Sequence, residues 1–133
     1  MPPDPLARLR SLCLRYPESS EKIAWGEPTF RVKDKLFAMY ASAETHHGNG
    51  RPAVWIKAMP VNQTLVITSD PDRFFAPPYV GPGGWIGVWL DRRPPWAAVR
   101  DLLDDGYRQA APKKVLALLD KDRPRSKSRR TSG

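Results

Sequence analysis

The chain has 133 residues, the size of one ordinary domain, and 41% hydrophobic and 27% charged residues are typical of a soluble globular protein. The longest uncharged stretch, residues 74–90, holds three prolines and four glycines, so no transmembrane helix is predicted. The N-terminus lacks the apolar core of a signal peptide. The single cysteine, Cys13, excludes an intrachain disulfide and a cysteine metal cluster. We therefore expect a cytoplasmic protein with no membrane partner.

The net charge of +8 is concentrated at the C-terminus. Residues 121–133 carry six basic residues against one acidic residue, and no hydrophobic residue follows Leu119. A segment of this composition cannot bury itself. The sequence thus predicts a folded domain over residues 1–120 and a disordered basic tail over residues 121–133. The tail would attract polyanions, or it is a solvated end without a role of its own.

The first predicted element is a helix that begins at Asp4-Pro5, an N-cap followed by proline at the first helical position. Apolar residues follow at helical spacing as far as Tyr16, and Pro17 ends the helix. The next residues are expected to be turn-like up to Thr29. Strands over residues 29–32 and 35–41 then form a tight hairpin around Lys33-Asp34. The second of these strands is apolar on both faces, which favours a central position.

Residues 42–52 are polar and contain glycine, so we expect a long exposed loop before a strand at 53–58. The segment over residues 60–69 fits either a strand, by its β-branched residues, or a short helix, by its apolar spacing. Residues 84–91 alternate like a strand, and Pro94-Pro95 and Pro112 each open a helix. The predicted fold class is α+β: a single domain with an antiparallel β-sheet and helices packed on one face.

Five segments carry a family resemblance: WGEPTFRV (25–32), DKLFA (34–38), FFAPPYVGPGGWIGVWLD (74–91), the helix that begins with Trp96, and Tyr107 followed by AAPKK (110–114). In order and spacing, residues 6–119 resemble the MmcQ/YjbR family of bacterial proteins. The resemblance implies one α+β domain, similar in fold to type III secretion chaperones. It also implies DNA binding through hairpin "wings". The family has no established catalytic residues, so the resemblance implies none here.

The residues themselves offer no catalytic set. Cys13 lies on the apolar side of its helix, which predicts a buried structural thiol. The only histidines, His46 and His47, are adjacent on the loop, so we expect them to point in different directions and to be solvated. The glycines of residues 81–84 lack the Lys-Ser/Thr of a phosphate-binding loop and lead into a strand, which predicts a tight turn. We therefore expect no enzyme activity, no cofactor and no metal.

The candidate binding residues are basic. Lysine and arginine contacts with phosphates give non-specific affinity for nucleic acid, although lysines at strand edges also prevent aggregation. Lys113 and Lys114 lie in the first turn of the last helix. The helix dipole disfavours positive charge there, and the free N–H groups of that turn favour the binding of an anion. The candidates are Arg31, Lys33, Lys35, Lys57, Lys113, Lys114, Arg125, Lys127, Arg129 and Arg130.

The sequence therefore predicts a small nucleic-acid-binding protein that binds DNA without sequence specificity. The alternative is a protein-binding adaptor of chaperone type, which would use an exposed apolar sheet or groove and no nucleic acid. We expect residues 74–85 to form a rigid clasp that packs Phe75 and Tyr79 against the body. In the rival interpretation both rings are exposed and stack on bases or on a partner.

Overall fold

The structure, a computed structural model, describes residues 4–122. In chain order its elements are α1 (Pro5–Cys13), β1 (Ser19–Ala24), β2 (Glu27–Val32), β3 (Lys35–Ala41), β4 (Ala53–Ile56), α2 (Pro60–Ser69), β5 (Phe74–Phe75), the 3-10 turn η1 (Gly81–Gly83), β6 (Ile86–Trp89), α3 (Trp96–Ala110) and α4 (Lys113–Asp122). Among these described residues, no helix is long and apolar enough to cross a membrane.

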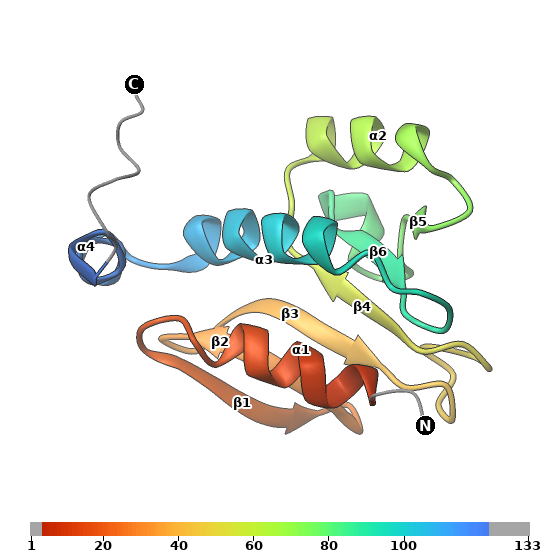
Figure 1. The fold of residues 1–133 in the computed structure, drawn as a ribbon, viewed down its shortest axis with the longest axis horizontal. Helices are drawn as coiled ribbons and strands as arrows, with labels where there is room; N and C mark the ends of the chain where they lie inside the picture. Colours follow the sequence, from red (N-terminus) through yellow and green to blue (C-terminus); the bar gives the residue numbers. More distant parts are fainter. Residues whose placement is uncertain (1–3, 123–133) are drawn as a thin grey trace.

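Six antiparallel strands form one sheet in the order β1-β2-β3-β4-β6-β5 (Figure 1). The first four strands follow one another along the chain, and β3 lies inside the sheet as its two apolar faces predict. Lys33 and Asp34 form the two-residue turn between β2 and β3, with φ angles of 50° and 65°. Such a turn matches the twist of the two strands, so the predicted hairpin is confirmed.

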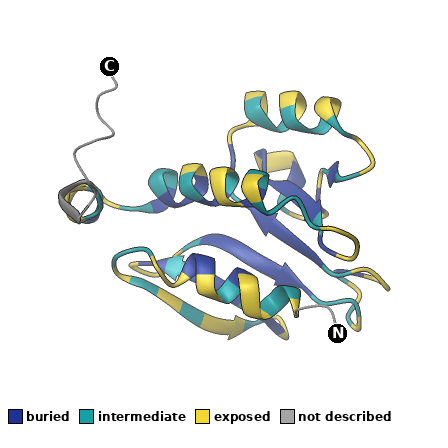
Figure 2. Ribbon diagram, in the orientation of Figure 1, coloured by how far each residue is buried: buried dark blue, intermediate teal, exposed yellow. Residues whose placement is uncertain are grey.

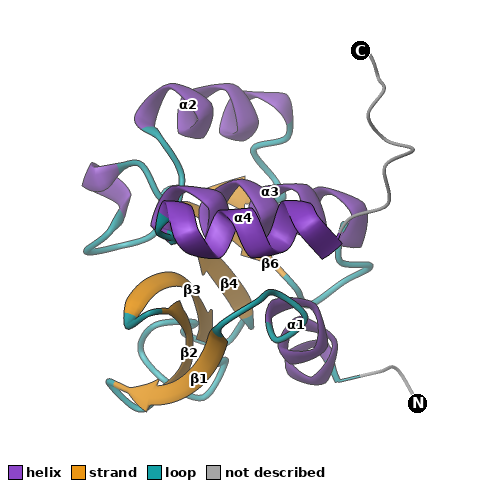
Figure 3. Ribbon diagram, turned by 90° about the vertical axis from the view of Figure 1, so that its left-hand side faces the viewer, coloured by secondary structure: helices purple, strands orange, loops and turns teal. Residues whose placement is uncertain are grey.

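Helices α1 and α3 cover one face of the sheet, which we call the covered face (Figures 1 and 3). Leu9 of α1 and Leu103 of α3 are fully buried there against Phe30 and Ile56 of the sheet. The buried residues of α3 recur at helical spacing and so share one side of the helix, which is coloured by burial in Figure 2: Val99, Leu103, Gly106, Tyr107 and Ala110. The predicted α+β fold with helices packed on one face is therefore confirmed.

Two local features let the helices approach the sheet closely. Phe30 pairs with Ala38 while Arg31 pairs with Leu36, so Phe37 is the extra residue of a β-bulge. The bulge directs both Phe37 and Ala38 into the covered-face core. Gly106 of α3 lies where an added Cβ would come within 2.8 Å of a backbone oxygen at the end of β4. Only glycine permits this contact without displacing the helix.

Cys13 is fully buried at the end of α1, in the covered-face core. Burial raises the pKa of its thiol, because the thiolate loses its hydration there. The predicted structural role of this cysteine is consistent with that position.

Two elements differ from the sequence-based expectation, and one open alternative is decided. Residues 19–24 are not turn-like but form β1, whose polar residues have low strand propensity and which gains its conformation from pairing with β2. The ambiguous residues 60–69 form helix α2, with proline at its first position. Strand β6 is shorter than predicted because η1 and Gly84, with a φ of 103°, occupy the approach to it.

Candidate functional site

The opposite face of the sheet, the open face, carries a second and smaller cluster of apolar side chains. Met39 of β3 pairs with Trp55 of β4, and both side chains are buried on this face. Trp85, just before β6, packs beside them. Loops and turns surround this cluster on the open face, so its outer wall depends on how those segments are held.

The β1–β2 turn provides the first wall of the site. Trp25 and Gly26 form this two-residue turn with φ angles of 54° and 78°, and the Trp25 side chain is 66% exposed. Turns of this type favour asparagine or aspartate followed by glycine, because a bulky residue is strained at positive φ. The fold therefore holds a large aromatic ring at the surface against the preference of its backbone.

The segment after β5 provides the second wall. Tyr79 follows two prolines, has a φ of 67° and is 73% exposed. The Gln63 side chain of α2 donates hydrogen bonds to the carbonyl oxygens of Gly81, at 2.8 Å, and Trp85, at 2.7 Å. These two bonds tie the segment to α2 and keep Tyr79 in place beside the open face.

The prediction that residues 74–85 pack both Phe75 and Tyr79 against the body holds for Phe75 only. Phe75 is half-buried: its ring lies over Gly87 and stacks on Trp89 with ring centres 4.1 Å apart. Gly87 leaves the room for this, since an added Cβ would come within 2.6 Å of the Phe75 ring. Tyr79, by contrast, is exposed and not packed as a clasp, which makes it available to a ligand.

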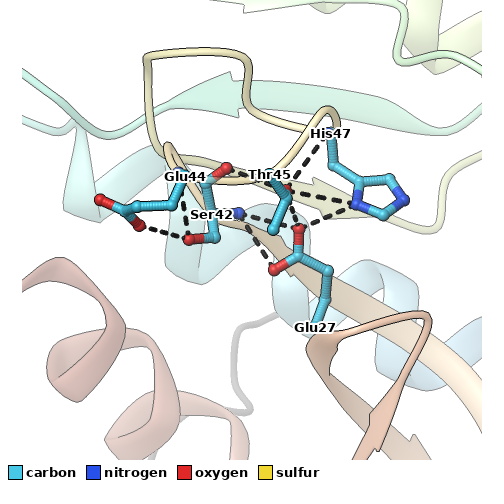
Figure 4. A network of polar contacts seen from close by, with 5 residues as sticks. All are labelled: Glu27, Ser42, Glu44, Thr45 and His47. Carbon is cyan, nitrogen blue, oxygen red and sulfur yellow. Dashed lines mark hydrogen bonds and ion pairs between the residues drawn. The ribbon is translucent and has the colours of Figure 1, made fainter.

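A buried hydrogen-bond network holds the loop of residues 42–52 over the open face (Figure 4). The carboxylate of Glu27, with no exposed surface, accepts bonds from the backbone N–H of Ser42, at 3.1 Å, and from the hydroxyl of Thr45. His47 Nδ1 lies 2.9 Å from the same carboxylate. In this contact Nδ1 is the hydrogen-bond donor when the carboxylate is ionised, and Nε2 then remains for another partner.

The histidine prediction is therefore wrong in two respects. His47 is not solvated, since its side chain is only 6% exposed. The rings of His46 and His47 do not point apart either, because their centres lie 4.0 Å from each other. The His47 ring also meets Trp55 edge to face at 5.6 Å and Tyr79 at 6.4 Å. The buried Glu27 decides this arrangement, and it lies 20 residues away in the sequence.

These walls enclose a cavity of about 590 Å³, which we call the aromatic pocket. Its volume lies within the usual range for small-ligand sites. Within the described residues, the buried Nε1–H of Trp55 has no hydrogen-bond partner. Six of the nine residues that line the pocket are aromatic: Trp25, Trp55, Trp85, Tyr79, His46 and His47, joined by Leu36, Met39 and Val80.

The chain matches the family model described as YjbR over residues 14–109. The chain belongs to the YjbR family. Among solved structures, it is similar in fold to protein DR2400 of Deinococcus radiodurans, which has a DUF419 domain. That match has a TM-score of 0.69 and 19% identity, and it covers 88% of this chain and 91% of the other. A Pseudomonas syringae protein matches with a TM-score of 0.63 and 16% identity, over 81% of this chain and 99% of the other. A search among curated proteins finds no match.

The YjbR domain places the predicted hairpin residues at one end of the sheet but on different faces. Arg31 is directly opposite Leu36, so it lies on the open face, next to a residue that lines the aromatic pocket. Lys35 is opposite Val32, which lies in the covered-face core. Lys33 is at the tip of the turn, where its ammonium lies 3.5 Å from the carboxylate of Glu18. The hairpin end is thus basic on both sides.

The remaining predicted residues lie elsewhere. Lys57 is half-buried just after β4, and its backbone N–H donates to the carbonyl oxygen of Phe37 at 3.0 Å. Lys113 and Lys114 are exposed in the first turn of α4, whose Val115 packs into the covered-face core. These two lysines belong to the helical layer, across the sheet from the pocket. Arg125, Lys127, Arg129 and Arg130 lie outside the described residues.

Lys22 is a basic residue of the open face that the sequence analysis missed. Lys22 of β1 is exposed and lies opposite Thr29, which in turn lies opposite Met39 of the pocket. Its strand was not expected, so its neighbours were not foreseen. No alternation of polar and apolar residues marks residues 19–24, because both faces of this stretch carry polar side chains.

Proposed function

We propose that this YjbR protein is a non-enzymatic nucleic-acid-binding protein that binds DNA without sequence specificity. One observation carries the proposal: the open face combines exposed basic side chains with aromatic rings, and α1 and α3 pack on the other face. Positive charge attracts the phosphate backbone, and aromatic rings offer surfaces on which bases stack. The net charge of +8 favours the same class of ligand.

Charges at the hairpin end supply the contacts to phosphate. Arg31 is half-buried, with its Nε donating to the Thr29 hydroxyl at 3.1 Å, which leaves its other nitrogens for a ligand. Lys33 projects from the turn, and its ion pair with Glu18 is exposed and so costs little to exchange for a phosphate. The basic residues of 121–133 would add affinity of the same non-specific kind.

The proposal assigns no reaction to the protein. Glu27 and His47 are the nearest approach to an acid–base pair. Their hydrogen bonds already have a structural use, since they hold the loop of residues 42–52 against the sheet. The Thr45 hydroxyl donates a hydrogen bond to the same carboxylate, which also accepts from the backbone N–H of Ser42, so it belongs to this structural network.

A titration of the full chain with a labelled DNA duplex and a labelled single strand, at two salt concentrations, tests the proposal. The variant Arg31→Gln/Lys33→Gln should bind more weakly. The slope of log K against log salt concentration should become shallower by about 0.7 (single strand) to 0.9 (duplex) for each phosphate contact removed. The matched control, Arg15→Gln/Arg100→Gln, removes two exposed charges from the helical side and should lose less affinity. No binding by the full chain at low salt, or equal losses in both variants, would contradict the proposal.

A second candidate function, the protein-binding adaptor, has an observation of its own. Helix α2 has no buried residue and exposes Val61 and Leu65, one helical turn apart and each 65% exposed, with Met59 just before them. An apolar stripe of this kind on a helix is typical of a contact with another protein. If the oligonucleotides do not bind, this stripe becomes the principal candidate site.

A further inference from the structure

We propose that the aromatic pocket holds one unstacked base of a single-stranded nucleic acid, whose phosphate lies against Arg31. The inference rests on the proposed function and narrows it: the preferred ligand is a single strand and not a duplex. In a duplex every base is stacked and paired, and it reaches such a pocket only after it has been turned out of the helix.

The lining of the pocket suits a flat ring with a π-face. Trp25 and Tyr79 stand at its exposed rim, and Trp55, Trp85 and His47 form the buried part. Aromatic side chains bind bases by stacking, in a manner that tolerates any base because every base has a π-face. A site for an aliphatic side chain would be lined mainly by leucine, isoleucine and valine, and here only Leu36 and Val80 are of that kind.

Two polar groups in the pocket wall match the edge of a base. The Nε1–H of Trp55 has no partner within the described chain, and such a buried donor is costly to leave unsatisfied. His47 Nδ1 is taken by Glu27, so its Nε2 is available as a hydrogen-bond partner. Base edges carry ring nitrogens and carbonyl oxygens that accept hydrogen bonds and N–H groups that donate them. A base would therefore supply an acceptor for Trp55 Nε1–H and a donor for His47 Nε2, which an aliphatic group lacks.

The two rim residues are held in strained backbone conformations. Trp25 and Tyr79 have φ angles of 54° and 67°, in the left-handed region that side chains other than asparagine, aspartate and glycine rarely adopt. Strain of this kind persists where the surrounding structure imposes it, and it is concentrated at ligand sites. Here it keeps two large exposed rings on opposite segments of one pocket.

Charge complementarity distinguishes a nucleotide from a neutral or cationic aromatic ligand. Arg31 is opposite Leu36, a residue of the pocket wall, at a separation typical of paired residues on one sheet face. Lys22 lies one strand further out on the same face. A base in the pocket would have its phosphate within reach of these two side chains. Continued chain on either side would carry further phosphates past the basic hairpin.

The test uses the full chain, a labelled thymidine oligonucleotide, the same strand with abasic sites, a matched duplex, and free thymidine monophosphate as competitor. The variant Trp25→Asn/Tyr79→Asn removes both rim rings and keeps residues that tolerate positive φ. The control Leu65→Asn removes an exposed apolar side chain from α2, away from the pocket. Circular dichroism verifies that all the variants are folded.

Loss of stacking on one base should weaken binding of the normal strand by about 5- to 100-fold in the rim variant. The Leu65→Asn control should bind like the wild type. The wild type should prefer the normal strand to the abasic strand and to the duplex, and the rim variant should no longer distinguish normal from abasic. The monophosphate should compete weakly, since it offers the base and only one phosphate.

Other outcomes separate this inference from the proposed function. The pocket inference is overturned if the wild type binds the abasic strand as tightly as the normal strand and the rim variant binds the normal strand as tightly as the wild type. Nucleic-acid binding then still stands. If the monophosphate binds through Trp25 and Tyr79 while no oligonucleotide binds, the site belongs to a small nucleotide and both statements about strands are wrong. If an apolar peptide displaces the strand and the monophosphate does not, the pocket takes a side chain and the inference is again overturned.

Discussion

The covered face and the open face of the sheet are completed by different means. On the covered face, apolar side chains of the sheet meet helices, and the core residues Leu9, Phe30 and Leu103 are fully buried. On the open face, Trp55 and Met39 meet loops, and one buried indole N–H has no partner within the described residues. The first face is arranged for stability. The open face carries strained turns, exposed aromatic rings and a buried carboxylate, a combination typical of a ligand-binding site.

The largest expected effect belongs to the covered face. Phe30→Ala removes a fully buried ring and leaves a cavity between the sheet and the helices, so it should lower the free energy of unfolding by about 3 to 5 kcal/mol. Urea denaturation measures the change. Any folded variant protein should retain its affinity for a single strand, because Phe30 lies across the sheet from the pocket. A loss of affinity in the folded variant would break the division between the faces.

The second expected effect belongs to the network beneath the loop of residues 42–52. Glu27→Gln keeps one acceptor oxygen but replaces the other with an NH2 group that can only donate and that would face the Ser42 N–H, which bonds to both carboxylate oxygens, so it should cost about 1 to 3 kcal/mol of stability. Thermal denaturation checks this, with Glu44→Gln as the control. Glu44 is exposed and bonds only within the loop, to the Ser42 hydroxyl, so its variant should melt close to the wild type.

The Glu27→Gln variant should also make the positions of His46 and His47 less fixed, and so weaken the binding of a single strand at the aromatic pocket. The Glu44→Gln control should not. Equal melting temperatures for the two variants would remove the buried carboxylate from the support of the site.

The smallest expected effect has the opposite sign. Trp25→Asn places in the β1–β2 turn a residue that adopts positive φ readily, so it should raise the stability of the hairpin by about 1 kcal/mol. The same change removes a rim ring, so the affinity for a single strand should fall. A more stable protein that binds less well would show that strain at this turn is maintained for the site. A stability loss would mean that the Trp25 ring contributes packing that outweighs its strain.

The sequence predicted most of the covered face. The spacing of Leu9, Leu12 and Cys13, and of Val99, Leu103 and Tyr107, indicated two helices with one apolar side each, and these sides are the ones that pack. The turn at Lys33-Asp34 was predicted from the two strand-like runs on either side of it. These predictions succeed because each pattern is local, and a buried side must carry apolar residues whatever its partner is.

The open face was predicted poorly. Strand β1 is polar, the histidine loop is polar, and no local pattern signals that either will be held against the sheet. The His47 side chain becomes buried because Glu27, from strand β2, is buried beneath the loop. Both residues are ordinary surface types by composition. Only the pairing of distant segments could reveal them.

The sequence by itself determined the fold class, the order of most elements, the hairpin tip, the buried thiol and the excess of positive charge. These follow from composition, periodicity and turn chemistry, which act over a few residues. The tertiary structure alone decided which face each basic residue occupies and which aromatic rings share the pocket. The physical reason is register: the β-bulge at Phe37 and the pairing of Arg31 with Leu36 place side chains on one face or the other. That choice is made between strands, by contacts that no single stretch of the chain contains.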